Sequence, residues 1–279
     1  VRLLCIDRRL ASWGSGLVSP QVSRSCEDIL GFSVSTEPAE VLAAAVLRGA
    51  CPAAGPRVIS CLNPHSVVQA QSDAGTKHAL RSADALIPDG IGIVLASAMT
   101  GGSVRHRVTG MDLFLALSRL MNERTGHRCF FLGASRETLR ALTAKYSREF
   151  PNVVVAGTLA PPFVTEFTDD QSLEMVNRIN EVEPDVLWVG MSAPKQEKWI
   201  QANRTRLRAC IAVPIGAVFD FYAGSIQRPG PLARALGLEW LVRLVREPRR
   251  LWRRTLISAP SFVVLLLRQH FGSRAPREG

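Results

Sequence analysis

The sequence predicts an α/β protein with a Rossmann-like parallel sheet and helices on both faces. Three observations lead to this prediction. Short apolar runs alternate with helical segments through most of the chain. The apolar runs between residues 128 and 213 are almost unbroken, which is typical of strands that are buried on both faces. Turn-forming residues such as Asn63-Pro64 and Pro88-Asp89-Gly90 follow the apolar runs.

The first elements are expected to start after residue 35. With Thr36 as the N-cap, Glu37-Pro38 introduce a helix that runs to Leu47. The pattern then predicts strands and helices in turn. Strands are expected at 57–62 and 84–87, and helices at 65–82, from 91 onward and at 111–123.

From residue 128 the alternation is regular and predicts βαβ units of a parallel sheet. Strands are expected at 129–132, 153–155, 185–189 and 209–213, and helices at 135–150, 170–182 and 194–203. Ligands of such sheets bind at the carboxyl ends of the strands. This rule selects the loops at Asn63, Asp89-Gly90, Gly133, Gly190 to Lys195, and Gly216 to Asp220.

Composition excludes intrinsic disorder as the main state, because 47% of the 279 residues are hydrophobic and 21% are charged. The net charge of +10 is uneven. Residues 228–279 contain 11 arginines, no lysine and three acidic residues, a net +8, which leaves +2 for residues 1–227. We therefore predict a poorly ordered N-terminal extension at 1–28, an α/β core at 29–227 and a basic amphipathic appendage at 228–279.

The appendage has an arginine face and an apolar face when residues 232–258 are plotted as one helix, which Pro248 must kink or split. This pattern is typical of a helix that lies at a membrane surface. A nucleic-acid-binding patch is the alternative, although no known motif accompanies it. No run approaches the roughly 18 apolar residues that a membrane span needs. The arginine face comprises Arg243, Arg246, Arg250, Arg253 and Arg254, and the apolar face Leu238, Leu241, Val245, Trp252 and Leu256.

The six cysteines are scattered, with no C-x-x-C pair and no histidine at a metal-binding distance along the chain. This arrangement favours reduced thiols in a cytosolic protein over a disulfide framework or a zinc site. We predict neither a metal nor another cofactor.

Several residues in the strand-end loops are candidates for chemistry. Asp89 is placed to take a proton from an acceptor hydroxyl, or it only caps the next helix. Asn63 offers a donor and an acceptor to a sugar, or it only forms a turn. Arg107 would bind an anionic group, or it lies in a solvated loop.

A phosphate site is predicted after residue 189. With Pro194 as the first helical residue, free backbone N–H groups, the helix dipole and Lys195 would attract a phosphate, although Lys195 and Lys198 also fit a solvated face. A dinucleotide-binding oxidoreductase remains an alternative, but its glycine fingerprint is missing, because Gly92 is followed by Ile93-Val94-Leu95.

A set of motifs in one order resembles the WecG/TagA/CpsF family of bacterial glycosyltransferases, glycosyltransferase family 26, from about Ile29 to Phe271. No single motif is specific, but the set is. It comprises Leu62-Asn63-Pro64, Ile87-Pro88-Asp89-Gly90-Ile91-Gly92, Arg107-Val-Thr-Gly110-Met-Asp112, Phe131-Leu132-Gly133, Ser192-Ala-Pro194-Lys195-Gln196-Glu197-Lys198-Trp199, Val218-Phe-Asp220-Phe-Tyr-Ala-Gly224 and Gly237-Leu-Glu-Trp240 through Arg250.

The resemblance implies an inverting, metal-independent transfer of a sugar, of the N-acetylmannosamine type or a related hexose or hexuronic acid. The donor would be a UDP-sugar and the acceptor a polyprenyl-diphosphate-linked saccharide. The enzyme would be peripheral at the cytoplasmic face of the cell membrane and would act in cell-envelope or exopolysaccharide assembly. Nucleic acid is not an implied partner, and the resemblance leaves a homo-oligomer open.

The resemblance also implies roles for individual residues. Asp89 matches the proposed catalytic base, Asn63 a pocket residue, and Gln196 and Asp220 positions associated with the nucleotide-sugar site. Three arginines match residues that are thought to reach the lipid diphosphate, and two positions depart from the family pattern. The arginines are Arg243, Arg250 and Arg253, and the departures are Cys61 for a usual Thr and Pro161-Pro162-Phe163 for a usual Gly-Tyr-Phe.

Overall fold

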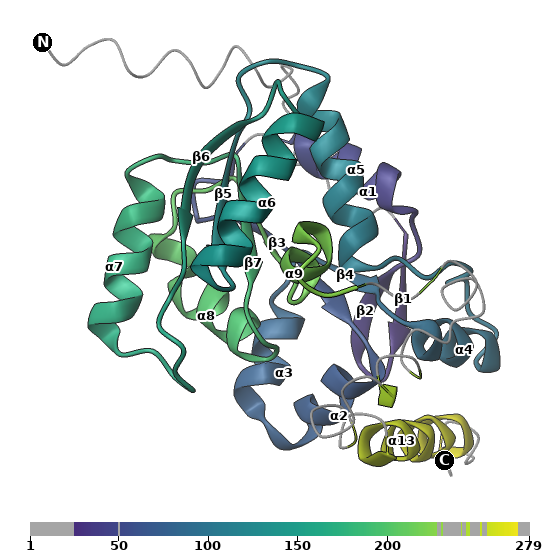
Figure 1. Ribbon diagram of the computed structural model, residues 1–279. Coiled ribbons are helices and arrows are strands. Elements are labelled where there is room, and N and C mark those ends of the chain that lie inside the picture. Colours follow the sequence, from purple (N-terminus) through teal and green to yellow (C-terminus); the bar gives the residue numbers. More distant parts are fainter. Residues whose placement is uncertain are drawn as a thin grey trace, which may run out of the picture.

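The protein folds around a single mixed sheet of eight strands within the residues that the structure describes (Figure 1). The computed structural model describes residues 25–49, 51–227, 230, 241, 244–245, 252 and 256–272. The strand order is β1-β2-β4-β3-β8-β7-β5-β6, and only the β1–β2 pair is antiparallel. This arrangement confirms the predicted α/β class. The strands are β1 Cys26–Ile29, β2 Phe32–Ser35, β3 Arg57–Leu62, β4 Ala85–Pro88, β5 Arg128–Gly133, β6 Val154–Leu159, β7 Val186–Gly190 and β8 Ile211–Pro214.

The helices that join these strands agree with most of the predicted segments, to within a few residues at their ends. They are α1 Ala39–Arg48, α2 Pro64–Ser72, α3 Ala74–Arg81, α4 Ile91–Met99, α5 Gly110–Asn122, α6 Arg136–Glu149, α7 Asp169–Asn180, α8 Lys195–Asn203, α9 Val218–Ala223 and α13 Ser258–Gly272, with a short 3₁₀ turn η1 at Arg204–Arg206.

Side chains alternate between the two faces of the sheet, so the strands from β3 to β8 each contribute to at least two hydrophobic clusters. Phe131, Trp188 and Val213 point to one face and pack with α1, α5, α6 and α9. Leu132 and Leu187 point to the other face and pack with α7 and α8. The continuous apolar runs of the sequence therefore reflect burial on both faces, as predicted.

A third cluster joins the C-terminal helix to the core. Leu62 of β3 packs there with Val67 of α2 and Ile93 of α4. Phe262 and Leu266 of α13 are 3% and 4% exposed in the same cluster. Figure 1 shows α13 lying beside α2, and the two helices are in contact. Residues at the end of the chain thus form part of the folded protein.

The hairpin of β1 and β2 was not predicted, and β1 begins within the segment 1–28 that we expected to be poorly ordered. Glu27 accounts for the difference. Its carboxylate accepts hydrogen bonds from Ser97 Oγ at 2.8 Å and from the backbone N–H groups of Ser103 at 2.6 Å and Val104 at 3.1 Å. These partners lie some 70 residues away, so local sequence patterns do not reveal them. The division into domains beyond this point stays a prediction.

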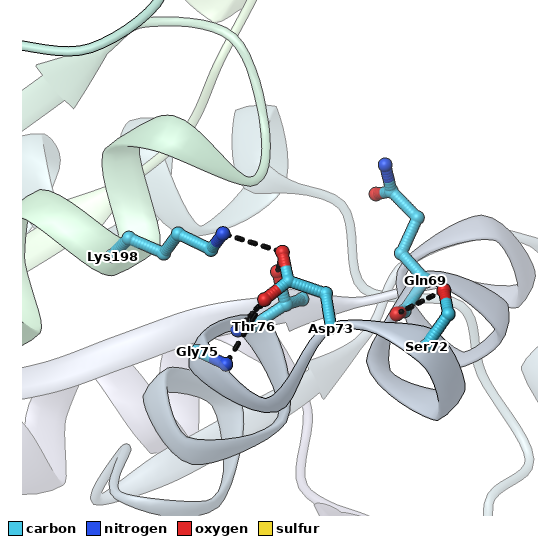
Figure 2. Close-up of polar contacts among 6 residues, drawn as sticks. All are labelled: Gln69, Ser72, Asp73, Gly75, Thr76 and Lys198. Carbon is cyan, nitrogen blue, oxygen red and sulfur yellow. Dashed lines mark hydrogen bonds and ion pairs between the residues drawn. The ribbon is translucent and has the colours of Figure 1, made fainter.

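The single helix predicted at 65–82 is wrong, because the segment forms α2 and α3 with Asp73 between them. Figure 2 shows that the Asp73 carboxylate caps α3, accepting from the backbone N–H groups of Gly75 at 3.0 Å and Thr76 at 3.2 Å. Asp73 also forms an ion pair with Lys198 of α8. The hydrogen bond from Lys198 is the main reason that the pKa of Asp73 falls to about 2.

Two predicted helix starts are also wrong. Pro38, not Thr36, is the N-cap of α1, because the Thr36 hydroxyl is bonded to Ser25 Oγ at 2.6 Å. Pro194 is the N-cap of α8, whose first helical residue is Lys195. Both helices therefore begin one or more residues later than expected.

The expectation that all thiols are reduced is wrong for one pair, because Cys51 and Cys210 form a disulfide. They are 159 residues apart, and their Cα atoms lie 4.5 Å apart where the chain after α1 passes the start of β8. No spacing motif indicates such a long-range pair. Of the other cysteines in the described ranges, Cys26, Cys61 and Cys129 form no disulfide.

The whole predicted arginine face, including Arg243, Arg250 and Arg253, lies outside the described residues, as does the Pro248 kink. The apolar positions Leu241, Val245, Trp252 and Leu256 are described, and their side chains are exposed. In the described ranges, no helix is both long enough and apolar enough to cross a membrane.

Candidate active site

Asn63 and Asp89 stand together at the carboxyl ends of two neighbouring strands. Leu62 of β3 pairs with Pro88 of β4, and the Asp89 backbone N–H donates to the Leu62 carbonyl at 2.8 Å. Each residue is half-buried. The register of the two strands, not the length of any loop, therefore brings Asn63 and Asp89 to adjacent positions of the backbone.

Asn63 combines a structural role with a free donor. Its Oδ1 accepts from the Ser66 backbone N–H at 3.1 Å and its own backbone N–H donates to Ser66 Oγ at 2.9 Å, so the two residues form a capping box at the start of α2. The turn alternative is therefore correct for the carbonyl of the side chain. Among the described residues Asn63 Nδ2 has no partner, which leaves it able to donate to a ligand.

The cap of α4 is Gly90, not Asp89. Gly90 adopts a φ of 103°, a conformation that disfavours other residues, and it ends the tight turn that follows Asp89. A Cβ on Gly92 would stand 2.5 Å from Pro64 Cγ, so a glycine there lets α4 approach the start of α2 closely. The two glycines of this motif thus serve the geometry of the Asn63–Asp89 pair.

Arg107 is held near this pair by its backbone. The next residue, Val108, donates from its backbone N–H to the carbonyl of Pro88 at 3.0 Å, and Pro88 directly precedes Asp89. Arg107 itself is half-buried, which does not fit the fully solvated loop that was its alternative. Arg105, in contrast, is exposed and donates to the Gly102 carbonyl at 2.6 Å.

Cys61, which stands where relatives have Thr, lies at the edge of the same site. A Cβ on Gly110, the first residue of α5, would lie 3.4 Å from Cys61 Sγ and 3.5 Å from Ile215, which follows β8. Three elements therefore meet at Cys61. A change in side-chain size at this position would shift the loops that follow β3 and β8.

Gln196 ties together the loops after β7 and β8. Its buried Oε1 accepts from the backbone N–H groups of Met191 at 3.2 Å and Gly216 at 3.0 Å. Its Nε2 donates to Glu197 Oε1 at 2.9 Å. The amide is thus occupied by the protein, and Gln196 joins the two strand-end loops to each other.

Gly133 and Gly190 are buried and are required by packing. A Cβ on Gly133 would overlap the carbonyl of Gly190, and one on Gly190 would overlap the ring of Phe219 in α9. The backbone N–H of Ala134 donates to the same Gly190 carbonyl at 3.0 Å. These glycines allow the ends of β5 and β7 and helix α9 to pack closely together. Because glycine has no side chain, neither residue can hold a ligand through one.

Lys195 and Lys198 both have partners in the protein. Lys195 Nζ donates to the Val164 carbonyl and lies 3.7 Å from the centre of the Phe167 ring, and burial lowers the pKa of this lysine. Lys198 points to Asp73 (Figure 2). Lys195 therefore fastens the loop that follows β6 over the start of α8, and a phosphate would have to compete with the Val164 carbonyl for its charge.

Asp220 lies in α9 and faces the start of α6. Thr138 Oγ1 donates to Asp220 Oδ1 at 3.2 Å, and Ser135 caps the same helix through the Thr138 backbone N–H at 3.1 Å. Asp220 is half-buried. It therefore marks the β5–α6 side of the strand-end edge, while Asn63 and Asp89 mark the β3–β4 side.

Glu197 is a feature of the site region that the sequence analysis missed as a functional signal. It is buried, its Oε2 has no hydrogen-bond partner, and burial raises its pKa to about 7 even though Gln196 donates to it. The one available sign was an acidic residue inside a motif that otherwise favoured an anion. Its position in the first turn of α8 puts a buried carboxyl with a raised pKa in direct contact with the Gln196 amide.

The strand-end edge thus offers a half-buried carboxylate, a free amide donor and a nearby arginine at one end, and rigid glycine-lined loops at the other. This combination can remove a proton from a hydroxyl and hold a polar, anionic substrate. Within the described residues no group of three or more His, Cys, Asp or Glu side chains is placed to hold a metal ion. Arg243, Arg250 and Arg253, the predicted diphosphate ligands, lie outside the described residues.

The family model and the individual relatives that match this chain point to the same family. The model of the glycosyl transferase WecG/TagA/CpsF family matches residues 27–276. An N-acetylglucosaminyldiphosphoundecaprenol N-acetyl-β-D-mannosaminyltransferase of Bacillus subtilis strain 168 is 30% identical over 76% of this chain and 79% of its own length. Proteins with the same name are 31% identical over 77% of this chain and 80% of their own length in Bacillus spizizenii, and 27% identical over 72% and 76% in Staphylococcus aureus strain MW2.

The family match covers the whole sheet, the strand-end loops and α13. It indicates a glycosyltransferase and not the oxidoreductase that the sequence had left as an alternative. The chain belongs to the WecG/TagA/CpsF family of glycosyltransferases.

Proposed function

We propose that this enzyme transfers an N-acetylmannosamine-type sugar from a UDP-sugar to a saccharide linked to a polyprenyl diphosphate. The relatives supply the acceptor class, since their names specify an N-acetylglucosaminyl group on diphosphoundecaprenol. The observation that carries the proposal for this chain is the pairing of β3 and β4, which brings Asn63 and Asp89 to adjacent strand ends. A related hexose or hexuronic acid would fit the same site chemistry.

In the proposed reaction Asp89 removes the proton from the acceptor hydroxyl while that oxygen attacks the anomeric carbon of the donor. The new C–O bond forms as the bond to the UDP oxygen breaks on the opposite face, so the anomeric configuration inverts. The proton ends on Asp89 and the electron pair on UDP. Asn63 Nδ2 is placed to hold a sugar hydroxyl, and Arg107 to offset the negative charge on a phosphate.

The proposed reaction uses no metal. Positive charge for the departing UDP would come from Arg107 and from the predicted diphosphate ligands Arg243, Arg250 and Arg253. The enzyme would work as a peripheral protein at the cytoplasmic face of the membrane, where a polyprenyl-linked acceptor is available. This placement fits a cell-envelope pathway.

Replacing Asp89 with Asn tests the base assignment. We expect Asp89→Asn to lower kcat by at least about 100-fold, because general base catalysis contributes on that order. Binding of UDP-sugar, measured as the rise in melting temperature with increasing ligand, should persist. Transfer is measured with a lipid-linked N-acetylglucosaminyl acceptor.

The matched control is Asp170→Asn, which changes an exposed carboxylate in the first turn of α7. It should keep both transfer and UDP-sugar binding. Near-normal transfer by Asp89→Asn would refute the role of Asp89 as the base, and loss of UDP-sugar binding together with transfer would place Asp89 in donor binding instead.

A further inference from the structure

Helix α4 presents an apolar stripe to solvent. Ile91, Leu95 and Met99 are 37%, 55% and 51% exposed and are spaced four residues apart, so they lie along one face of the helix. Large apolar side chains are common on surfaces one at a time, but an aligned group marks a binding surface. We call these three residues the α4 stripe.

Helix α4 is not an ordinary amphipathic helix, which would have one apolar and one polar face. The helix contains no charged residue, and its one polar side chain, Ser97, is buried and donates to Glu27 Oε2 at 2.8 Å. Ile93 and Ala96 already supply the face that packs on the core. The helix is therefore apolar on its inner and its outer face, and the outer face lacks a partner within the described chain.

The stripe starts at the candidate active site. Ile91 is the first residue of α4 and follows Asp89 by two positions, and the stripe extends about 12 Å from there at 1.5 Å per residue. Gly92 keeps this end of the helix against Pro64 and thus next to Asn63. An elongated apolar ligand that reaches the active site with its polar end could lie along this face.

Helix α13 also presents apolar side chains to solvent. It shares a buried cluster with α4, and its outward side chains include Val263, Val264 and Leu267, which are 49%, 46% and 39% exposed. Arg268 is the one charged residue of this helix. Two helices that contribute to the same buried cluster thus both turn apolar side chains outward.

We propose that the α4 stripe binds the isoprenoid chain of the lipid-linked acceptor, so that this chain runs from the diphosphate along Ile91, Leu95 and Met99. The proposal rests on the proposed function, which supplies a polyprenyl acceptor. It adds a binding surface on the folded core to that function. Burying two of these side chains against a hydrocarbon would contribute enough free energy to change the acceptor KM measurably.

The test compares two acceptors that carry the same N-acetylglucosaminyl diphosphate, one on an undecaprenyl chain and one on a short chain of two isoprene units. For the double variant Leu95→Gln and Met99→Gln we expect the KM of the long-chain acceptor to rise about tenfold, with the short-chain KM and kcat unchanged. Glutamine keeps helix propensity and similar size at these exposed positions. The matched control is Leu173→Gln, on the exposed face of α7.

A photoreactive undecaprenyl diphosphate provides a readout that does not depend on turnover. It should label the peptide of α4 in the wild-type enzyme and label it much less in the double variant. If the wild type transfers sugar but the ratio of the two KM values is the same in the double variant, the inference is wrong while the proposed function stands. If the wild type transfers to neither acceptor, the proposed function fails and the inference falls with it.

Two other results would also overturn the inference. One is a loss of binding to phosphatidylglycerol vesicles in the double variant with an unchanged KM ratio, which would make the stripe a contact with the bilayer. The other is a dimer in the wild type that the double substitution dissociates, which would make the stripe an interface between copies of the chain.

Discussion

Among single residues, Glu197 has the most unusual environment. Its carboxyl group is buried, with Oε2 lacking a partner and Oε1 accepting from the amide that joins the loops after β7 and β8. Burial raises its pKa to about 7, so the folded protein keeps a proton on this group that the unfolded chain releases near pH 4.5. Between these two values the folded state binds more protons, and its stability therefore falls as pH rises.

Replacing Glu197 with Gln should remove this pH dependence. The amide keeps the acceptor for Gln196 and cannot ionise. We expect the free energy of unfolding of Glu197→Gln, relative to wild type, to increase by on the order of 3 kcal/mol between pH 5 and pH 8. Urea denaturation at the two pH values measures it. A difference between the two proteins that is the same at both pH values would contradict the assignment.

The sequence located the strand-end residues but not their contacts. Asn63 and Asp89 could be selected because apolar runs end immediately before them, and parallel strands end at one edge. The partners of Lys195 could not be predicted, because Val164 and Phe167 come from a loop about 30 residues away in the sequence. Gly133 and Gly190 were selected as ligand-binding positions for the same reason, whereas their surroundings show a need for close packing. The catalytic role of Asp89 stays a prediction.

At the scale of elements, the β1–β2 hairpin and α4 depend on each other through Glu27. Burial alone would raise the pKa of Glu27, but hydrogen bonds from Ser97, Ser103 and Val104 lower it below its usual value. The carboxylate thereby holds the turn that ends α4, and with it the far end of the α4 stripe. The stability from these bonds is present above about pH 4.5 and is lost as pH falls through the lowered pKa.

Removing this carboxylate should loosen that turn. We expect Glu27→Ala to lower the free energy of unfolding by about 2 kcal/mol at pH 7, because the buried hydroxyl of Ser97 loses its acceptor. Hydrogen exchange of the residues that follow α4 should increase most. Glu166→Ala, at an exposed loop position, is the control and should change neither quantity. Equal stability of the two variants would show that water replaces the carboxylate without cost.

Regular elements were predictable where local pattern and tertiary structure agree. Strands β3, β5, β7 and β8 are largely apolar because both of their faces are covered. Such runs of apolar residues can be recognised from the sequence alone. The failures occur where a distant residue decides. Lys198 stabilises the Asp73 cap that divides α2 from α3, and Glu27 holds a hairpin that has little apolar content of its own. Neither effect has a local periodicity.

For the whole molecule, α13 makes the end of the chain part of the fold. Phe262 and Leu266 fill the cluster that also contains Ile93 and Leu62. Removing the appendage would therefore expose core residues as well as remove arginines. Loss of activity after truncation cannot by itself be assigned to lost membrane contact, and a point substitution is the better probe.

Phe262→Ala should destabilise the protein by about 3 kcal/mol, because a buried aromatic side chain leaves a cavity. Protection from hydrogen exchange should fall in α2 and α4, which share the cluster. Val263→Ala, on the exposed side of the same helix, should have little effect on stability. If Phe262→Ala unfolds at the same urea concentration as wild type, α13 does not contribute to the core as described.

The bond between His65 Nδ1 and Ser258 Oγ, 2.8 Å long, has a mechanical consequence. It joins the first turn of α2 to the first residue of α13, and α2 starts at Asn63. The C-terminal helix is thus joined directly to the helix that Asn63 caps. A tilt of α13 would pull on the first turn of α2, so the orientation of α13 and the position of the Asn63 cap are coupled in the fold.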